Sequence, residues 1–153
     1  TTPETPFEVG KAYEVWRSEG IPSTGSGRLQ PLVAIIACGS LVHNAVLAAS
    51  QLEKDGIMVT VINNHTIKSM DEDSIIAAAK EAGAVVTVEE HQVMGGMGSA
   101  VAEVLARNYP VPMEFVGVQN QFGESGEPAE LVEKFGMGVT SIVEAVKKVV
   151  KRK

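Results

Sequence analysis

Three mostly apolar runs, each bordered by an amphipathic segment, limit what this chain can fold into more than any other feature. They cover residues 32–37, 57–62 and 84–89, and the first is apolar at every position. A strand that is apolar at consecutive positions is buried on both faces, as in a parallel sheet. Strands that alternate with helices form right-handed crossovers, so helices cover both faces. The pattern predicts an α/β fold, a three-layer α/β/α sandwich with a mostly parallel sheet.

Residues that begin and end helices fit between these runs. Ser40 and Asp71 stand where N-cap residues are expected. Gly56 and Gly83 stand where left-handed residues end helices. A fourth strand is predicted over residues 113–118, and further helices over 99–108, over 128–136 and from 140 onward.

The 153 residues are predicted to form one domain preceded by a lead-in. Thr1–Pro6 has a linker-like composition, which favours a cut at a domain boundary. Residues 7–16 are expected to form a short extended or helical segment, and Ser18–Pro31 is rich in Gly, Ser and Pro. Residues 1–31 are therefore assigned to a linker and lead-in with a flexible loop, and residues 32–153 to the α/β domain.

Charge and composition exclude several classes of partner. The formal net charge of −6 repels a phosphate backbone, so nucleic acid is not an expected partner. No apolar run approaches the roughly 20 residues that a membrane-spanning helix needs. Cys38 is the single cysteine, which excludes an intrachain disulfide and fits a cytoplasmic protein. The basic residues between 147 and 153 are interpreted as a helix end complementing its dipole rather than as a binding patch.

Polar residues follow each predicted strand. The carboxyl ends of parallel strands meet at one edge of an open sheet, where ligands bind. The richest polar segment follows the third strand and runs into a glycine turn. A candidate interdomain or ligand rim is predicted there, formed by Glu89, Glu90, His91, Gly95, Gly96 and Gly98.

Several kinds of chemistry can be weighed at this rim. Free amides in the glycine turn at residues 95–98 could bind a phosphate, but the turn matches neither GxGxxG nor a P-loop. The preferred interpretation is that its glycines let a helix and a loop approach closely. His91 could act as a general base and Cys38 as a nucleophile, although an interface histidine and a buried thiol are commoner. The three histidines lack the spacing of a zinc site, so no metal and no catalytic residue is predicted.

The order of five segments resembles the carboxy-terminal domain of transketolases, and similar domains occur in 1-deoxyxylulose-5-phosphate synthases and the β subunits of 2-oxo-acid dehydrogenases. The segments are residues 7–12, 34–52, 56–71, 88–103 and 122–136. The Phe-Gly-Glu-Ser-Gly sequence in the last one favours transketolase. The Glu-Glu-His-x-x-x-Gly-Gly form in the fourth resembles transketolases split into two polypeptides, whose second subunit would end here.

Two departures from the family pattern stand out. Lys68-Ser69-Met70-Asp71 replaces a Pro-Leu form of the connection after the second strand, and the Ser18–Pro31 segment is longer than usual. They affect the local structure that is expected, not the fold.

The resemblance implies a function for the complete enzyme. Such an enzyme moves a two-carbon ketol unit between sugar phosphates in the pentose phosphate pathway, with thiamine diphosphate and a divalent metal such as Mg²⁺. The cofactor lies between domains that this sequence does not contain. The chain is therefore expected to be an assembly or dimerisation domain that binds no cofactor alone and is inactive alone. Its expected partners are the cofactor-binding domains or subunit and a second copy of itself.

Two alternatives stay open. One is an independent regulatory module that binds a small ligand or nucleotide on the amides of residues 95–98. The other is the equivalent domain of a 1-deoxyxylulose-5-phosphate synthase.

Overall fold

A computed structural model describes residues 7–19 and 32–153 of the protein. The predicted linker at residues 1–6 and most of the predicted flexible loop, residues 20–31, lie outside the described residues. Among the described residues, no helix is both long enough and apolar enough to cross a membrane. The elements are β1 (Tyr13–Arg17), β2 (Leu32–Ala37), α1 (Leu41–Lys54), β3 (Met58–Asn63), α2 (Glu72–Ala82), β4 (Val85–Gln92), α3 (Met97–Asn108), β5 (Met113–Val118), α4 (Pro128–Lys134) and α5 (Val139–Val150).

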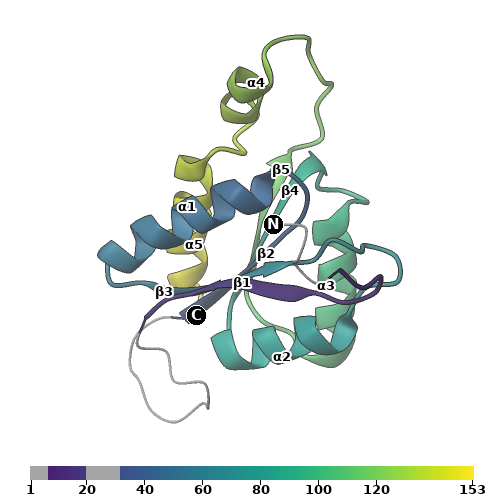
Figure 1. The fold of residues 1–153 in the computed structure, drawn as a ribbon, viewed down its shortest axis with the longest axis vertical. Coiled ribbons are helices and arrows are strands. Elements are labelled where there is room, and N and C mark those ends of the chain that lie inside the picture. Colours follow the sequence, from purple (N-terminus) through teal and green to yellow (C-terminus); the bar gives the residue numbers. More distant parts are fainter. Residues whose placement is uncertain (1–6, 20–31) are drawn as a thin grey trace.

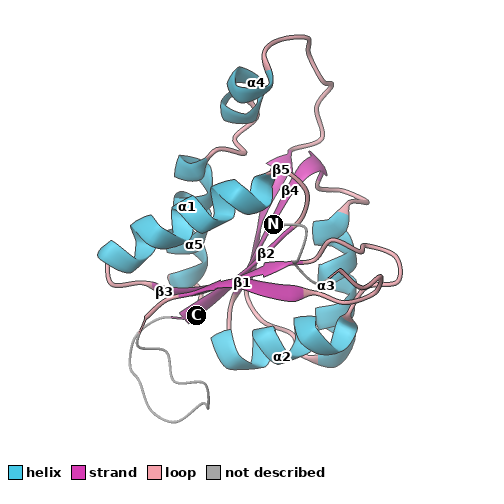
Figure 2. Cartoon of the chain, in the orientation of Figure 1, coloured by secondary structure: helices cyan, strands magenta, loops and turns pink. Residues whose placement is uncertain are grey.

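The five strands form one sheet in the order β1-β3-β2-β4-β5. Strands β2 to β5 pair in parallel, and β1 pairs antiparallel with β3. Helices α1 and α5 cover one face and α2 and α3 cover the other (Figure 1, Figure 2). The predicted three-layer α/β/α sandwich with a mostly parallel sheet is confirmed.

The central strand β2 supplies both layers of the core. Val33 and Ile35 pack with α1 and α5, whereas Ala34 and Ile36 pack with α2 and α3. All four side chains are fully buried. Successive side chains on a strand point to opposite faces, so a run that is apolar at every position is what a sheet covered on both sides requires.

Strand β1 lies in the segment for which the sequence left two possibilities, and the extended one is correct. It pairs with β3 at the edge of the sheet, with a register shift between Glu14 and Trp16. Glu14 and Val15 are both exposed. The strand therefore lacks the alternation of apolar and polar residues by which a half-buried strand is recognised.

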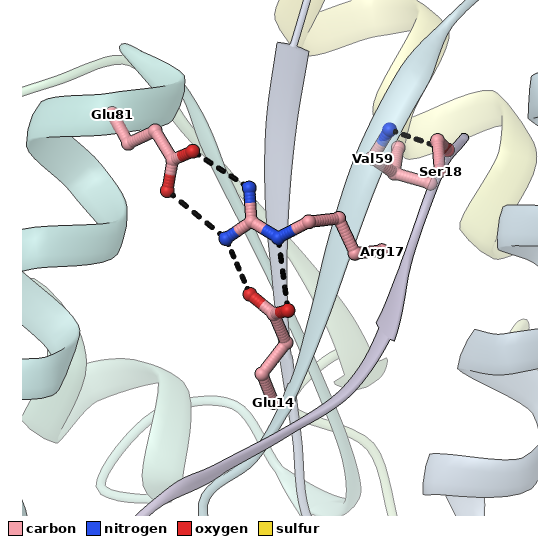
Figure 3. A network of polar contacts seen from close by, with 5 residues as sticks. All are labelled: Glu14, Arg17, Ser18, Val59 and Glu81. Carbon is pink, nitrogen blue, oxygen red and sulfur yellow. Dashed lines mark hydrogen bonds and ion pairs between the residues drawn. The ribbon is translucent and has the colours of Figure 1, made fainter. Parts of the chain in front are cut away.

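Polar contacts fasten β1 to the rest of the domain (Figure 3). The Arg17 guanidinium lies between two carboxylates, with Nε 2.9 Å from Oε1 of Glu14 and Nη1 2.7 Å from Oε1 of Glu81. The Ser18 amide donates to the Val59 carbonyl at 3.0 Å, and the Val59 amide donates to the Ser18 hydroxyl at 3.1 Å. Residues that precede position 32 thus belong to the sheet.

The expected helix caps are correct except one. Asp71 caps α2 by accepting from the Ser74 amide, and Gly83 ends α2 with a left-handed φ of 69°. Ser40 was expected to cap α1, and this is wrong. Its side chain makes no capping bond, and its hydroxyl donates to Oε2 of Glu90.

The basic end of α5 contacts the body of its own domain. Lys147 pairs with Asp55, with Nζ 2.7 Å from Oδ2. Lys148 and Arg152 both pair with Glu114. These ion pairs support the interpretation of the basic residues as a helix end.

Candidate functional site

The carboxyl ends of the parallel strands gather at one edge of the sheet, as predicted. Ser40, which follows β2, donates to Glu90 in β4. Gln92 in β4 donates through Nε2 to the carbonyl of Gln121, which follows β5, at 2.6 Å. The strand β4 runs further than expected, to Gln92, and its register with β5 shifts between Val88 and Gln92. The predicted rim thus begins in an irregular part of the strand.

Glu89 is buried beneath this rim, with 2 % of its surface exposed. Its Oε2 accepts from the Met97 amide at 2.6 Å, and its Oε1 accepts from the Gly98 amide at 2.8 Å. These amides stand at the N-terminus of α3, where they have no partner within the helix and the helix dipole favours a negative charge. The Glu89 carboxylate therefore occupies the place at which this helix would bind an anion.

All four amides of the glycine turn are engaged within the chain. The Gly95 amide donates to the Ser99 hydroxyl at 2.9 Å, and the Gly96 amide donates to the Val93 carbonyl at 3.2 Å. The Met97 and Gly98 amides donate to the Glu89 carboxylate. This turn thus offers none of its donors to a phosphate while these bonds are in place.

Two of the glycines make room for Glu89. A Cβ at position 96 would lie 2.3 Å from Oε2 of Glu89, and one at position 98 would lie 2.6 Å from Oγ1 of Thr87. Such distances are far below van der Waals contact. The interpretation that the glycines permit a close approach of helix and loop is therefore supported. Gly95 differs, since it is exposed and has a φ of +81°.

The remaining rim residues, Glu90 and His91, are exposed. Nδ1 of His91 lies 2.9 Å from the Gln92 carbonyl oxygen. Because a carbonyl only accepts, Nδ1 of His91 is the donor in this hydrogen bond. Glu90 accepts from Ser40. Both side chains are thus exposed on the surface of the described part of the chain.

Cys38 is half-buried rather than fully buried as expected. Burial and, to a smaller extent, the nearby Glu89 carboxylate raise the pKa of its thiol to about 11. The thiolate is the nucleophilic form of cysteine. Cys38 is therefore protonated at neutral pH, which argues against its acting as a nucleophile.

An aromatic stack at the end of β3 was not predicted from the sequence. The ring of Phe7 lies on that of His65 with centroids 4.3 Å apart, and the ring of Tyr13 lies 5.6 Å from His65. Beside this stack Asn64 is fully buried, and neither polar atom of its side chain has a hydrogen-bond partner among the described residues. The polar segment at residues 63–66 was the only sequence signal for this corner.

Thiamine diphosphate and its metal, which the resemblance implies for the complete enzyme, do not fit the residues of this rim. The turn amides already donate to acceptors of the chain, as described above. Within residues 7–19 and 32–153, no group of three or more His, Cys, Asp or Glu side chains is placed to hold a metal ion.

Comparison with known proteins adds the family. The profile described as "Transketolase, C-terminal domain" matches residues 27–142. The chain is 47 % identical over 121 residues to the 6-deoxy-6-sulfo-D-fructose transketolase subunit SqwH of Clostridium sp. (strain MSTE9), a match that covers 79 % of this chain and 38 % of that protein. It is 38 % identical over 143 residues to a 1-deoxy-D-xylulose-5-phosphate synthase of Synechococcus sp. (strain JA-2-3B'a(2-13)), covering 93 % of this chain and 20 % of that protein.

A solved structure is similar over nearly the entire chain. The structure titled "Split gene transketolase, inactive beta4 tetramer" superposes with a TM-score of 0.85 at 38 % sequence identity, covering 99 % of this chain and 46 % of that one. The chain thus spans less than half the length of these relatives. By the extent of the profile match and of the structural similarity, this chain belongs to the transketolase C-terminal domain family.

Proposed function

We propose that this chain is the carboxy-terminal assembly domain of a thiamine-diphosphate-dependent transketolase that transfers a two-carbon ketol unit between sugar phosphates. The proposal that the chain is not catalytic by itself rests on one observation. The Glu89 carboxylate accepts hydrogen bonds from the Met97 and Gly98 amides. The helix N-terminus at the glycine turn, which could otherwise receive a phosphate, is filled by the chain itself. The 47 % identity to a protein named as a transketolase subunit supports the transferase part.

The chemistry of the rim also favours an inactive isolated chain. A catalytic site needs a nucleophile, a base and a group that stabilises charge at one place. Here Cys38 is protonated, and the ring of His91 is exposed at the surface. The cofactor would therefore be held by other domains of the enzyme, and the isolated chain would bind neither thiamine diphosphate nor Mg²⁺.

The rim has two parts in this proposal. The exposed residues Glu90, His91 and Gly95 contact the cofactor-binding domains or subunit. The residues beneath, Glu89, Gly96 and Gly98, hold the rim in shape, since the first is buried and the other two would clash with side chains if they carried a Cβ. A homodimer within a cytoplasmic enzyme is the assembly we expect.

The alternative of a 1-deoxyxylulose-5-phosphate synthase domain has one observation in its favour, the 38 % identity to such an enzyme over 143 residues. The Phe-Gly-Glu-Ser-Gly sequence at residues 122–126 favours transketolase. The independent ligand-binding module is disfavoured by the four engaged amides.

The test is an assay of the chain alone and after mixing with the polypeptides that carry the missing cofactor-binding domains. We expect no heat of thiamine diphosphate binding and no ketol transfer from the chain alone, and activity upon mixing. Turnover or tight cofactor binding by the isolated chain would overturn the proposal. Activity with pyruvate and glyceraldehyde 3-phosphate, instead of two sugar phosphates, would favour the synthase alternative.

A further inference from the structure

The segment that joins β5 to α4 stands away from the body of the domain (Figure 1, Figure 2). We call residues 119–127 the arm. Every residue of the arm is exposed, and the next helix, α4, contains no buried residue. Phe122 is 96 % exposed, more than any other large apolar side chain among the described residues. An almost fully exposed aromatic ring on a projecting segment is unusual, since aromatic side chains contribute most when they are buried.

The arm is tied down although it is not buried. The Gln92 side chain donates to the Gln121 carbonyl at 2.6 Å, and Nζ of Lys134 pairs with Oε2 of Glu124. Leu131 lies beneath Gly126, where a Cβ would come within 3.2 Å of its Cδ2. The arm thus has a defined course before any partner binds. A preformed binding element loses less conformational entropy on association than a disordered one.

A second exposed apolar side chain accompanies Phe122. Met94 is 72 % exposed in the loop that follows β4, the strand next to β5. The start of this loop is hydrogen-bonded to the end of β5, just before the arm, because the Val93 amide donates to the Val118 carbonyl at 3.1 Å. Exposed apolar residues that occur together mark contact sites more than isolated ones do. A flexible Met side chain in the neighbouring loop can adapt to the surface that receives an aromatic anchor.

The charge around the arm indicates the kind of surface that it fits. Residues 119–134 contain four glutamates and one lysine, a net charge of −3. A complementary surface is therefore an apolar pocket bordered by Lys or Arg. A second copy of this chain is poorly suited to provide it, because most of its basic cluster is engaged. Lys147, Lys148 and Arg152 form ion pairs, and Lys153 donates to the Ala82 carbonyl.

We propose that the arm anchors this chain to the cofactor-binding polypeptide of its enzyme, with Phe122 inserted into an apolar pocket bordered by cationic side chains. This inference rests on the proposed function, which supplies the partner. It goes further by assigning the contact to the arm and by specifying the surface that receives it. Buried aromatic side chains at the centre of an interface carry most of its binding energy.

Calorimetric titration of this chain against the polypeptides that carry the missing cofactor-binding domains tests the inference. We expect Phe122→Ala to weaken binding at least about tenfold, as the loss of an aromatic hot spot does. Leu47→Ala is the matched control, because Leu47 is an exposed apolar residue on α1, 46 % exposed. We expect this control to bind as tightly as the parent chain. Circular dichroism should give both variants the parent melting temperature, since neither side chain is buried.

A second variant tests the charge. Glu127→Gln removes one exposed negative charge next to the turn at Gly126, and we expect it to slow association and to reduce the dependence of binding on salt. If the parent chain binds and Phe122→Ala binds equally well, the role of the arm is overturned while the assembly function stands. If the parent chain does not bind at all, both the role of the arm and the proposed assembly function are wrong. If Phe122→Ala changes only the sedimentation of the chain by itself, the arm contacts a second copy and the inference is wrong.

Discussion

The carboxylate of Glu89 accepts hydrogen bonds from two backbone amides in the first turn of α3, which have no acceptor within the helix. Removing it in Glu89→Ala leaves the Met97 and Gly98 amides buried and unpaired. An unpaired buried donor costs about 1–3 kcal/mol, so we expect a loss of about 3 kcal/mol in the free energy of unfolding. Urea denaturation measures it. Glu90→Ala, which removes an exposed carboxylate, should cost much less, and equal losses would contradict the role assigned to Glu89.

Gly96 is a residue at which even one methyl group has no room. In Gly96→Ala the new Cβ would meet both the Glu89 carboxylate and the Gln92 carbonyl, at 2.3 and 2.4 Å. Overpacking of this kind costs about 1–3 kcal/mol, and we expect about 2 kcal/mol by thermal denaturation. Gly123→Ala is the control, because a Cβ there meets nothing within 4 Å. A neutral Gly96→Ala would show that the carboxylate can leave its place without loss.

At the scale of elements, Asp71 connects α2 to the lead-in of β1. Its Oδ2 accepts from the Ala12 amide at 3.0 Å, and its Oδ1 accepts from the Ser74 amide at 3.2 Å. Burial alone would raise the pKa of Asp71, but these hydrogen bonds, with that from the Ser74 hydroxyl, bring the pKa below its usual value. The helix cap and the attachment of the edge strand thus depend on one ionised carboxylate.

The lowered pKa of Asp71 makes the stability of the protein depend on pH. A depressed pKa gives stability that is present above the unfolded pKa of about 3.9 and is lost as the pH falls through the folded pKa. Asp71→Asn should cost about 1 kcal/mol at pH 7, and the difference from the parent should shrink below about pH 4. Asp73→Asn, an exposed carboxylate in the same helical turn, should give a smaller and flatter difference. A constant difference across this pH range would argue against the linkage.

Besides the Asp71 carboxylate, the ion pairs of Arg17 also attach the edge strand β1 to the rest of the domain. The Arg17 guanidinium bridges Glu14 and Glu81, the latter in α2, and the side chains of Arg17 and Glu81 are 28 % and 32 % exposed. Half-exposed ion pairs contribute about 1 kcal/mol at most, so Arg17→Met should speed amide exchange in β1 roughly fivefold. Hydrogen exchange measured by mass spectrometry checks this. Lys54→Met, on α1, should leave β1 unchanged.

At the scale of the whole molecule, β1 decides where the domain can be cut. The boundary between residues 31 and 32 remains a prediction, but a chain that starts at Leu32 lacks the strand that covers the edge of β3. An uncovered strand edge is a template for pairing with other chains. We therefore expect the shortened chain to melt at a lower temperature and to aggregate in size-exclusion chromatography with light scattering. A chain that starts at Phe7 should behave as the parent does. Equal behaviour of the two shortened chains would mean that β1 adds no stability.

The four parallel strands could be predicted because their signal is local. The inner strands β3, β2 and β4 are buried over most of their length, so their own residues, such as Val33 to Ala37 in β2, are almost all apolar. Strand β1 could not be assigned, because an edge strand with exposed residues such as Glu14 and Val15 has no such pattern. Ser40 has the residue type and position of an N-cap, but a neighbouring strand brings Glu90 within reach of its hydroxyl. A contact of this kind competes with a local one only after the sheet has formed.

The sequence by itself determined the fold class and the family. Hydrophobic periodicity reports burial within a few residues, and the order of the five matching segments reports common descent. Only the tertiary structure decided what the rim can bind. From the sequence alone, the four amides of the glycine turn could be free or engaged. Two of them are engaged because Glu89 accepts from them, and the position of Glu89 depends on the irregular end of β4 beside β5. The exposure of Phe122 was likewise decided by the course of the chain, because an apolar residue is buried or exposed only by what packs around it.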